Sequence, residues 1–132
     1  MSKVVSISEA ASIALHGMII IARSDKNVNV LDIAEATQTS KHHVAKVMQR
    51  MVKQGYLSSQ RGPTGGFIIK KDPAEITLLE IYEAIEGEIE LTKCYLDKQI
   101  CPFNKCFMDS LTYDLSVMFK DYMKKQTLDK YI

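Results

Sequence analysis

The sequence has few cysteines, no long hydrophobic run and no basic leader, and each absence excludes a class of protein. Three cysteines in 132 residues are too few, and odd in number, for the disulfide framework of a small secreted domain. No window of about eighteen consecutive apolar residues occurs, so no transmembrane helix is predicted. The first residues, MSKVVSISEAAS, lack a basic region before a long apolar run, so no secretory signal is predicted. We therefore expect a cytoplasmic protein without a membrane partner.

Acidic residues are also missing from one block of the chain. Residues 41–71 carry seven Lys and Arg side chains and no Asp or Glu, although the net charge of the whole chain is only +1. Residues 75–90 show the reverse, with six Glu and no basic residue. A local basic block is typical of a face that binds a polyanion, and an ordinary solvated surface is the alternative. The order of the predicted elements decides between a polyanion-binding face and an ordinary surface.

Hydrophobic periodicity and capping residues predict three helices in the first 54 residues. The first begins at a capping box of Ser6 and Glu9, or at Ser8, and reaches about residue 23. The second is short and ends near residue 37. After a tight turn at 38–39, Ser40 caps a third helix that reaches about residue 54 and ends at Gly55.

The third helix has one apolar face and one polar, cationic face without an acid. Its core-facing residues recur at helical spacing: Val44, Val47, Met48 and Met51. The opposite face carries His42, Lys46, Gln49 and Lys53, with His43 and Arg50 at its edges.

A β-hairpin with a glycine-rich tip follows, with strands expected at 56–61 and 67–70. The order helix, short helix, tight turn, cationic helix and hairpin is that of a winged helix-turn-helix, whose second helix enters the major groove of DNA. We therefore expect a double-stranded DNA operator as partner. The residues expected to contact it are Ser40, Lys41, His42, His43, Lys46, Gln49, Arg50, Arg61, Gly62, Thr64 and Gly65.

The remainder of the chain is expected to form a cysteine-containing loop between two helices. A capping box of Thr77 and Glu80 begins a helix that ends near residue 86, residues 88–106 are irregular, and a last helix spans about 107–125. This last helix carries an apolar seam widened by Phe107 and Phe119 and made of Met108, Leu111, Leu115, Met118 and Tyr122. The predicted fold is thus mainly α with a small β-hairpin wing: residues 1–75 form the winged helix-turn-helix, and 76–132 form the cysteine loop and a dimerisation helix in the same compact unit.

Cys94, Cys101 and Cys106 lie within thirteen residues and are the chain's complete set of cysteines. Thiolates are soft ligands suited to an iron–sulfur cluster or zinc, but the spacing lacks the C-x-x-C pairs of a zinc finger. The alternative is that the cysteines are small hydrophobic anchors of the loop. The candidates for a fourth ligand are Asp109, one expected helical turn after Cys106, the nearby acids Asp97 and Asp114, and the distant His16 in the first helix.

These motifs resemble the bacterial IscR/NsrR-type winged helix-turn-helix regulators along nearly the whole chain. The resemblance lies in the first helix (residues 13–22), Asp32-Ile33-Ala34, the expected recognition helix (40–47), Gly55-Tyr56-Leu57, the wing signature RGPTGGF (61–67) and Thr127-Leu128. It implies a homodimer built through the long C-terminal helix. It also implies that the three cysteines hold an iron–sulfur cluster of the 2Fe-2S or 4Fe-4S type.

The resemblance leaves more than one choice for the fourth ligand. The IscR branch has a histidine three residues after the third cysteine, where Asp109 stands here. NsrR-like members use an acid in the first helix, at the position matching Ser12, and a related redox-sensing branch uses a histidine that matches His16. We take His16 as the first candidate and Asp109 as the alternative, and a ligand from the first helix would come from the partner chain.

The expected function is that of a DNA-binding repressor whose operator affinity changes when a cluster responds to nitric oxide, redox state or iron. One alternative is a cluster-free regulator that uses cysteine thiols or a small effector. Another is a winged-helix adaptor for proteins, which the acid-free cationic helix argues against. An enzyme is not expected, because no Ser/His/Asp set, phosphate-binding glycine loop or paired carboxylates stand out.

Overall fold

Helix α1 (Glu9–Ala22) is the central element of the computed structural model, which describes all 132 residues. It contacts α2, α3, α4, β2 and η2, which explains why its sequence is apolar around most of its circumference. Ser8 caps it by accepting a hydrogen bond from the Ala11 N–H at 3.0 Å. The prediction of a start at the Ser6 capping box was wrong, because the helix begins after Ser8 and leaves Ser6 exposed outside it.

The helix-turn-helix is formed by α2 (Val30–Thr37) and α3 (Lys41–Lys53). Gln38 adopts a left-handed conformation (φ 54°) that turns the chain between them, as the predicted tight turn requires. Ser40 accepts a hydrogen bond from the His43 N–H at 3.1 Å, so the predicted cap of α3 is confirmed. The predicted core-facing side of α3 is buried, which directs its polar side outward.

The wing consists of β1 (Leu57–Gln60) and β2 (Gly66–Ile69), paired antiparallel with Gln60 opposite Gly66. The hairpin was predicted, although β1 is shorter than expected and β2 begins and ends one residue earlier. A pairing that sequence reasoning missed adds Val28 to the wing. Its N–H donates to the Phe67 carbonyl at 2.9 Å, and the Phe67 N–H donates back to the Val28 carbonyl at 2.7 Å.

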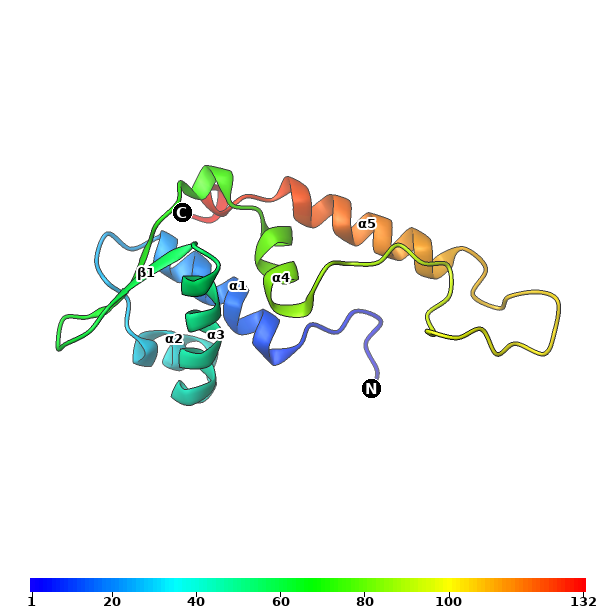
Figure 1. Cartoon of the computed structure of the whole chain (residues 1–132), viewed down its shortest axis with the longest axis horizontal. Helices are drawn as coiled ribbons and strands as arrows, with labels where there is room; N and C mark the ends of the chain where they lie inside the picture. Colours follow the sequence, from blue (N-terminus) through cyan, green and yellow to red (C-terminus); the bar gives the residue numbers. More distant parts are fainter.

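Beyond the wing lie η1 (Pro73–Glu75), α4 (Leu78–Glu86), α5 (Leu111–Lys125) and η2 (Leu128–Tyr131). The Thr77–Glu80 capping box of α4 is present as predicted. The end of the chain returns to the start of α4, where the Leu128 N–H donates to the Ile76 carbonyl at 3.0 Å. Figure 1 shows α5 running from this region to the cysteine loop, at the end of the molecule opposite the wing.

The last helix begins at Leu111, so the prediction of a start at Phe107 was wrong. Asp109 has a positive φ of 50°, and Ser110 is also non-helical and forms no side-chain cap. A left-handed residue takes the chain out of an α-helix, which places Phe107 and Met108 in the loop. The exposed seam of α5 therefore consists of Leu111, Leu115, Met118 and Tyr122.

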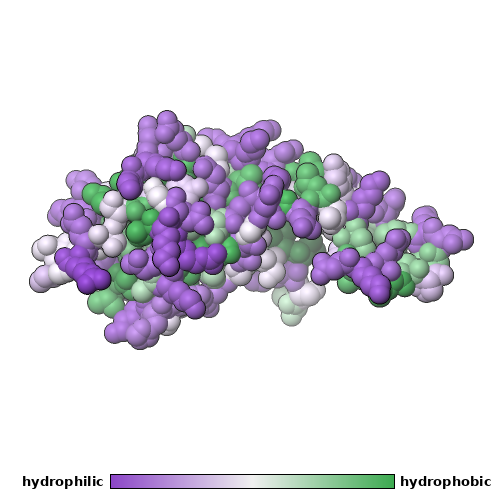
Figure 2. Space-filling view, viewed as in Figure 1, coloured by the Kyte–Doolittle hydropathy of each residue, from purple (hydrophilic) through white to green (hydrophobic).

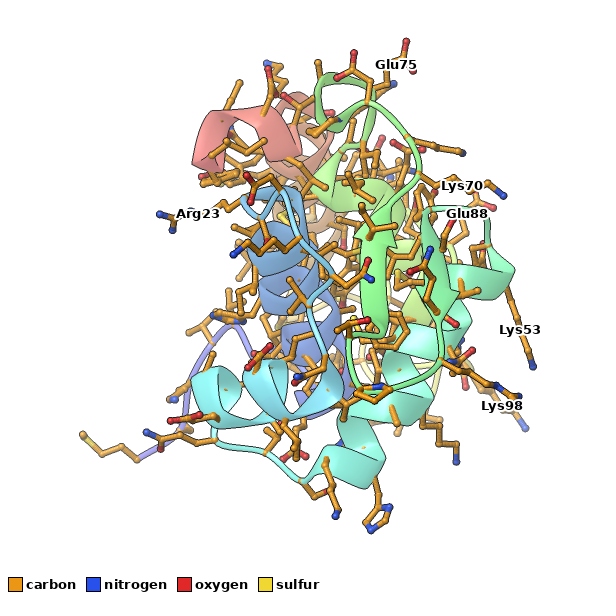
Figure 3. All side chains as sticks on the ribbon, turned by 90° about the vertical axis from the view of Figure 1, so that its left-hand side faces the viewer. Arg23, Lys53, Lys70, Glu75, Glu88 and Lys98 are labelled. Carbon is orange, nitrogen blue, oxygen red and sulfur yellow. The ribbon has the colours of Figure 1, made fainter.

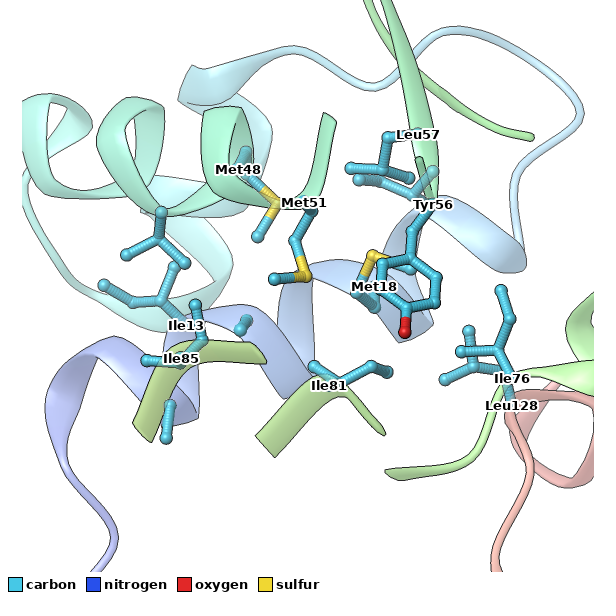
Figure 4. Packing of buried hydrophobic residues seen from close by; sticks show 14 of the residues in the cluster. Ile13, Met18, Met48, Met51, Tyr56, Leu57, Ile76, Ile81, Ile85 and Leu128 are labelled. Carbon is cyan, nitrogen blue, oxygen red and sulfur yellow. The ribbon is translucent and has the colours of Figure 1, made fainter. Parts of the chain in front are cut away.

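A single hydrophobic core of 21 buried residues unites the elements (Figure 4). It draws on α1, α3 and the wing, and also on Ile76, α4 and Leu128. The mainly α winged-helix fold is thus confirmed, while the functional division at residue 75 stays a prediction. None of the helices combines the length and apolar character that a membrane crossing requires.

Candidate nucleic-acid interface and cysteine loop

The polar face of α3 and the wing lie at the same end of the molecule, which faces the viewer in Figure 3. Lys41, His42, Lys46 and Gln49 are exposed and form no side-chain hydrogen bond or ion pair within the chain. Figure 3 shows Lys53 pointing from α3 into solvent. These side chains are therefore free to bind an external anion.

The tip of the wing is fixed by Asn27, a residue that no sequence motif had indicated. Its Nδ2 donates to Gln60 Oε1 and to the Thr64 carbonyl, both at 3.0 Å. Gly66 (φ 143°) allows the hairpin to approach the neighbouring segment, because a Cβ there would lie 2.5 Å from the Val28 carbonyl oxygen. Arg61 stands exposed and unpaired on this fixed support, together with Gly62 and Thr64. Gly65 is half-buried.

Two residues predicted to contact DNA form contacts within their own chain. His43 is half-buried, and its Nδ1 lies 2.6 Å from Glu9 Oε1. Arg50 Nη2 donates to the carbonyls of Ala84 (3.0 Å) and Ile85 (3.2 Å) at the end of α4. Their position at the edges of the polar face places both side chains within reach of neighbouring helices.

These contacts belong to a junction between α1, α3 and α4. Ser8 Oγ donates to Glu86 Oε1, which joins the start of α1 to the last residue of α4. Glu83 Oε2 accepts a hydrogen bond from the Ile89 N–H at 2.7 Å, which holds the first residues of the following loop against α4. The junction therefore lies between the recognition helix and the segment that leads to the cysteines.

The three cysteines are free thiols on the irregular segment between α4 and α5. Cys94 and Cys101 are half-buried, and Cys106 is exposed. The Leu96 N–H donates to Cys94 Sγ at 3.4 Å, and the rings of Tyr95 and Phe107 meet edge to face with centroids 6.1 Å apart. The aromatic pair brings the two ends of the loop together.

The possible metal ligands are not gathered in the single chain. No three His, Cys, Asp or Glu side chains are placed to hold one metal ion. Asp109 precedes α5 instead of lying on it, but its N–H donates to the Cys106 carbonyl at 3.2 Å, so it does lie one turn beyond Cys106, although that turn is not part of the helix. Asp97 is exposed, and Asp114 accepts a hydrogen bond from Ser110 Oγ at 3.1 Å.

His16 is exposed on α1, with Nδ1 2.8 Å from the Ser12 carbonyl oxygen. Because a carbonyl oxygen only accepts, Nδ1 carries the hydrogen in this contact. In the tautomer that carries its hydrogen on Nδ1, the lone pair of Nε2 can bind a ligand outside α1.

An apolar groove of about 510 Å³ follows α5 and the N-terminal segment. It is lined mainly by Val4, Val5, Ile7, Tyr82, Ile89, Leu115, Met118, Phe119 and Tyr122. Phe119 packs edge to face on Tyr82, but the seam residues Met118 and Tyr122 remain 67% and 58% exposed. Figure 2 shows hydrophobic surface over α5 and continuing onto the cysteine loop. The seam therefore lacks a cover within one chain.

Comparisons with known proteins agree with this architecture. Residues 7–132 match the family model Rrf2, described as iron-dependent transcriptional regulator. Among curated proteins, the HTH-type transcriptional regulator IscR of Photorhabdus laumondii is 25% identical over 127 residues, which cover 96% of this chain and 74% of that protein.

Solved structures share the fold. CymR, the global cysteine regulator of B. subtilis, superposes with a TM-score of 0.75 at 21% identity, covering 95% of this chain and 94% of that one. T. potens IscR gives a TM-score of 0.73 at 20% identity, covering 96% and 85%. The family match, the wing and the cationic helix lead to one conclusion: the chain belongs to the Rrf2 family of winged helix-turn-helix transcriptional regulators.

Proposed function

We propose that this regulator binds a double-stranded DNA operator as a homodimer and that chemistry at the cysteine loop changes its affinity for the operator. The observation that carries the proposal is the exposed, unpaired cationic face of α3 beside the wing. Lysine and arginine on such a face neutralise phosphates and release counterions. The uncovered seam of α5 supports the homodimer, because exposed apolar side chains on one helix face are stabilised by a second copy.

In this arrangement the first residues of α3 enter the major groove and the wing lies on the adjacent backbone or minor groove. Ser40, Lys41 and His42 stand at the entering end, and Lys46 and Gln49 follow along the helix. Arg61, at the base of the wing tip, is placed for the minor groove. His43 and Arg50 contribute through the junction that positions α3.

The test is the salt dependence of binding to a mixed-sequence DNA duplex, measured by fluorescence anisotropy. Lys46→Ala and Arg61→Ala each remove one cation from the proposed DNA interface and should lower the slope of log K against log salt by about one unit. Lys130→Ala is the matched control, because it removes the same charge from the exposed C-terminal segment. Equal slopes in the parent protein and in all three variants would contradict this docking.

For the sensor, Cys94, Cys101 and Cys106 are the side chains that would hold an iron–sulfur cluster. Three soft thiolates on an irregular segment fit the chemistry of such a cluster, and the family description names iron. When bound, the cluster supplies a centre sensitive to redox state, nitric oxide and iron supply. The thiols do not converge in the single chain, so we derive no step through the cluster.

His16 is the first choice for the fourth ligand, donated by the partner chain. In Figure 1 the cysteine loop extends beyond α5 and away from α1, so a second chain has to supply a ligand from α1. His16→Ala should lower the cluster content and alter the visible spectrum of anaerobically purified protein, whereas Asp109→Ala should leave both unchanged. If only Asp109→Ala lowers the cluster content, Asp109 is the ligand. If neither variant changes the cluster, neither residue is a ligand.

A second candidate is a cluster-free regulator in which the thiols themselves respond to oxidation or to a small effector. The exposure of Cys106 favours it, because an accessible thiol can be oxidised or modified. Iron and acid-labile sulfide assays on anaerobically purified protein distinguish the two candidates. A metal-free protein whose operator affinity changes on thiol alkylation would select the second.

A further inference from the structure

The tip of the wing, residues 61–65, has few bonds of its own that hold it in place. The strand pairing ends at Gln60 and Gly66, so the tip lies beyond the paired residues. Within the tip, one backbone hydrogen bond is present, from the Gly65 N–H to the Gly62 carbonyl at 3.0 Å. A two-stranded hairpin is marginally stable by itself, and a short loop at its end opens easily. Arg61, the cation proposed to contact DNA from this tip, therefore needs a support from outside the wing to keep one position.

Asn27 provides this support. Its Nδ2 donates to Gln60 Oε1 and to the Thr64 carbonyl, both at 3.0 Å. The two acceptors lie on either side of Arg61 in the sequence. A carbonyl oxygen only accepts, so the atom that faces Thr64 has to be the amide nitrogen, whose two hydrogens allow both bonds at once. One side chain thus joins the two ends of the tip.

The segment that carries Asn27 is itself attached to the hydrophobic core. The next residue, Val28, exchanges two backbone hydrogen bonds with Phe67, at 2.9 and 2.7 Å, and both side chains are buried. On the other side, the Ser24 hydroxyl donates to the Lys26 carbonyl at 3.0 Å and accepts from the Lys26 N–H at 3.1 Å. Asn27 therefore lies on a short segment that is fixed at both ends.

We propose that Asn27 is a positioning residue for DNA binding, which holds the wing tip so that Arg61 stays in one place beside α3. Asn27 is half-buried and both of its Nδ2 hydrogens are used within the chain, so it does not itself bind nucleic acid. A loop that is ordered before it binds loses less conformational entropy on binding, which raises the affinity. This inference rests on the proposed DNA-binding function and adds a residue from outside both the helix-turn-helix and the wing.

A double-mutant cycle tests whether Asn27 acts through Arg61. Affinity for the mixed-sequence duplex is measured by anisotropy for the parent protein, Asn27→Ala, Arg61→Ala and the double variant. In the parent background Asn27→Ala should weaken binding about fivefold, because the tip loses its external support. In the Arg61→Ala background the same change should weaken binding less than about twofold, since no cation remains to be positioned. Without DNA, Asn27→Ala should also accelerate hydrogen exchange of the Gly65 N–H.

Thr77→Ala is the control for a general loss of stability. It removes the side-chain cap of α4 and should lower Tm, but it leaves the bonds of the wing tip intact, so its DNA affinity should equal that of the parent. Circular dichroism verifies that each variant folds. If Asn27→Ala does not fold, Gln60→Ala takes its place in the cycle, because it removes one of the two bonds at an exposed position.

Equal losses from Asn27→Ala in both backgrounds would overturn the inference and leave Asn27 with a structural role only. Parent-like affinity of Asn27→Ala, or unchanged exchange of the Gly65 N–H, would also overturn it. In each of these cases a weakened Arg61→Ala would still support the proposed function. Parent-like affinity of Arg61→Ala would instead refute both the docking of the wing and the role of Asn27. Absence of duplex binding by the parent protein would refute the proposed function itself.

Discussion

Replacing Arg50 with alanine distinguishes a DNA contact from a structural contact within the chain. Arg50 lies on the recognition helix in the acid-free block, and its charge alone suggests a phosphate ligand. In the structure its Nη2 donates to the carbonyls of Ala84 and Ile85 at 3.0 and 3.2 Å. These belong to the last turn of α4, where carbonyls lack partners within the helix and a cation is favourable.

The loss of unfolding free energy expected for Arg50→Ala follows from those two hydrogen bonds. A hydrogen bond from a charged donor contributes roughly 1.5–3 kcal/mol. Both contacts come from one nitrogen of an exposed side chain, so together we count them as a single shared contact of about 2 kcal/mol. For a chain of 132 residues this corresponds to a decrease in Tm of roughly 6–10 °C. The salt slope of DNA binding should remain close to that of the parent protein, because no phosphate contact is lost.

Circular dichroism melting and anisotropy titrations measure the two quantities on the same samples. Arg50→Lys is the matched control, because it keeps the charge but loses the planar group that reaches both carbonyls. We expect it to resemble Arg50→Ala in Tm. An unchanged Tm in Arg50→Ala, combined with a salt slope lowered by about one unit, would refute the structural role and make Arg50 a DNA ligand.

Three further predictions test other parts of the molecule. Leu115→Asp should convert the dimer to monomer in sedimentation equilibrium, because a charge buried in the α5 seam would cost several kcal/mol, and a stable dimer would disprove this interface. Gly66→Ala should lower the free energy of unfolding by about 2–4 kcal/mol in denaturant titrations, since its φ of 143° and the 2.5 Å approach to Val28 exclude a Cβ; an unchanged midpoint would contradict this. Burial raises the pKa of Tyr56 above 10.0, and the charge of Glu80 and its hydrogen bond raise it further. The unfolded chain therefore loses this proton at a lower pH than the folded chain, so the free energy of unfolding falls as the pH rises above 10.0. Tyr56→Phe should reduce that fall, and identical profiles of unfolding free energy against pH would exclude the role of Tyr56.

Local signals in the sequence predicted the elements that depend on nearby residues. Ser40 and the Thr77–Glu80 box cap their helices because a cap involves only the next three backbone positions. The start of α5 was misplaced because no local signal marks it. Periodicity continues through Phe107 and Met108, but the backbone leaves the helix at Asp109, whose side chain gives no strong signal for a left-handed turn.

The contacts that complete the site are distant in sequence and had no local signal. Asn27 binds the wing tip 33 and 37 residues away, and Arg50 binds α4 34 and 35 residues away. The segment before α2 also pairs with the wing through Val28 and Phe67, 39 residues apart in the sequence. Composition identified the charged face, but only the packed helices show that Arg50 bonds within the chain while Lys46 stays unpaired.

In the proposed regulator, α4 is the element through which chemistry at the cysteine loop would reach α3. This helix contacts α1, α3 and α5, and it ends directly before the segment that carries the cysteines. Its last turn is held by Arg50 from α3, while the Ile89 N–H binds Glu83 within the same turn. A rearrangement of the loop that displaces Ile89 therefore acts on the part of α4 to which the recognition helix is attached. Because two hydrogen bonds from one planar group fix the angle between α3 and α4 more firmly than a flexible lysine does, Arg50 suits this position as a rigid link.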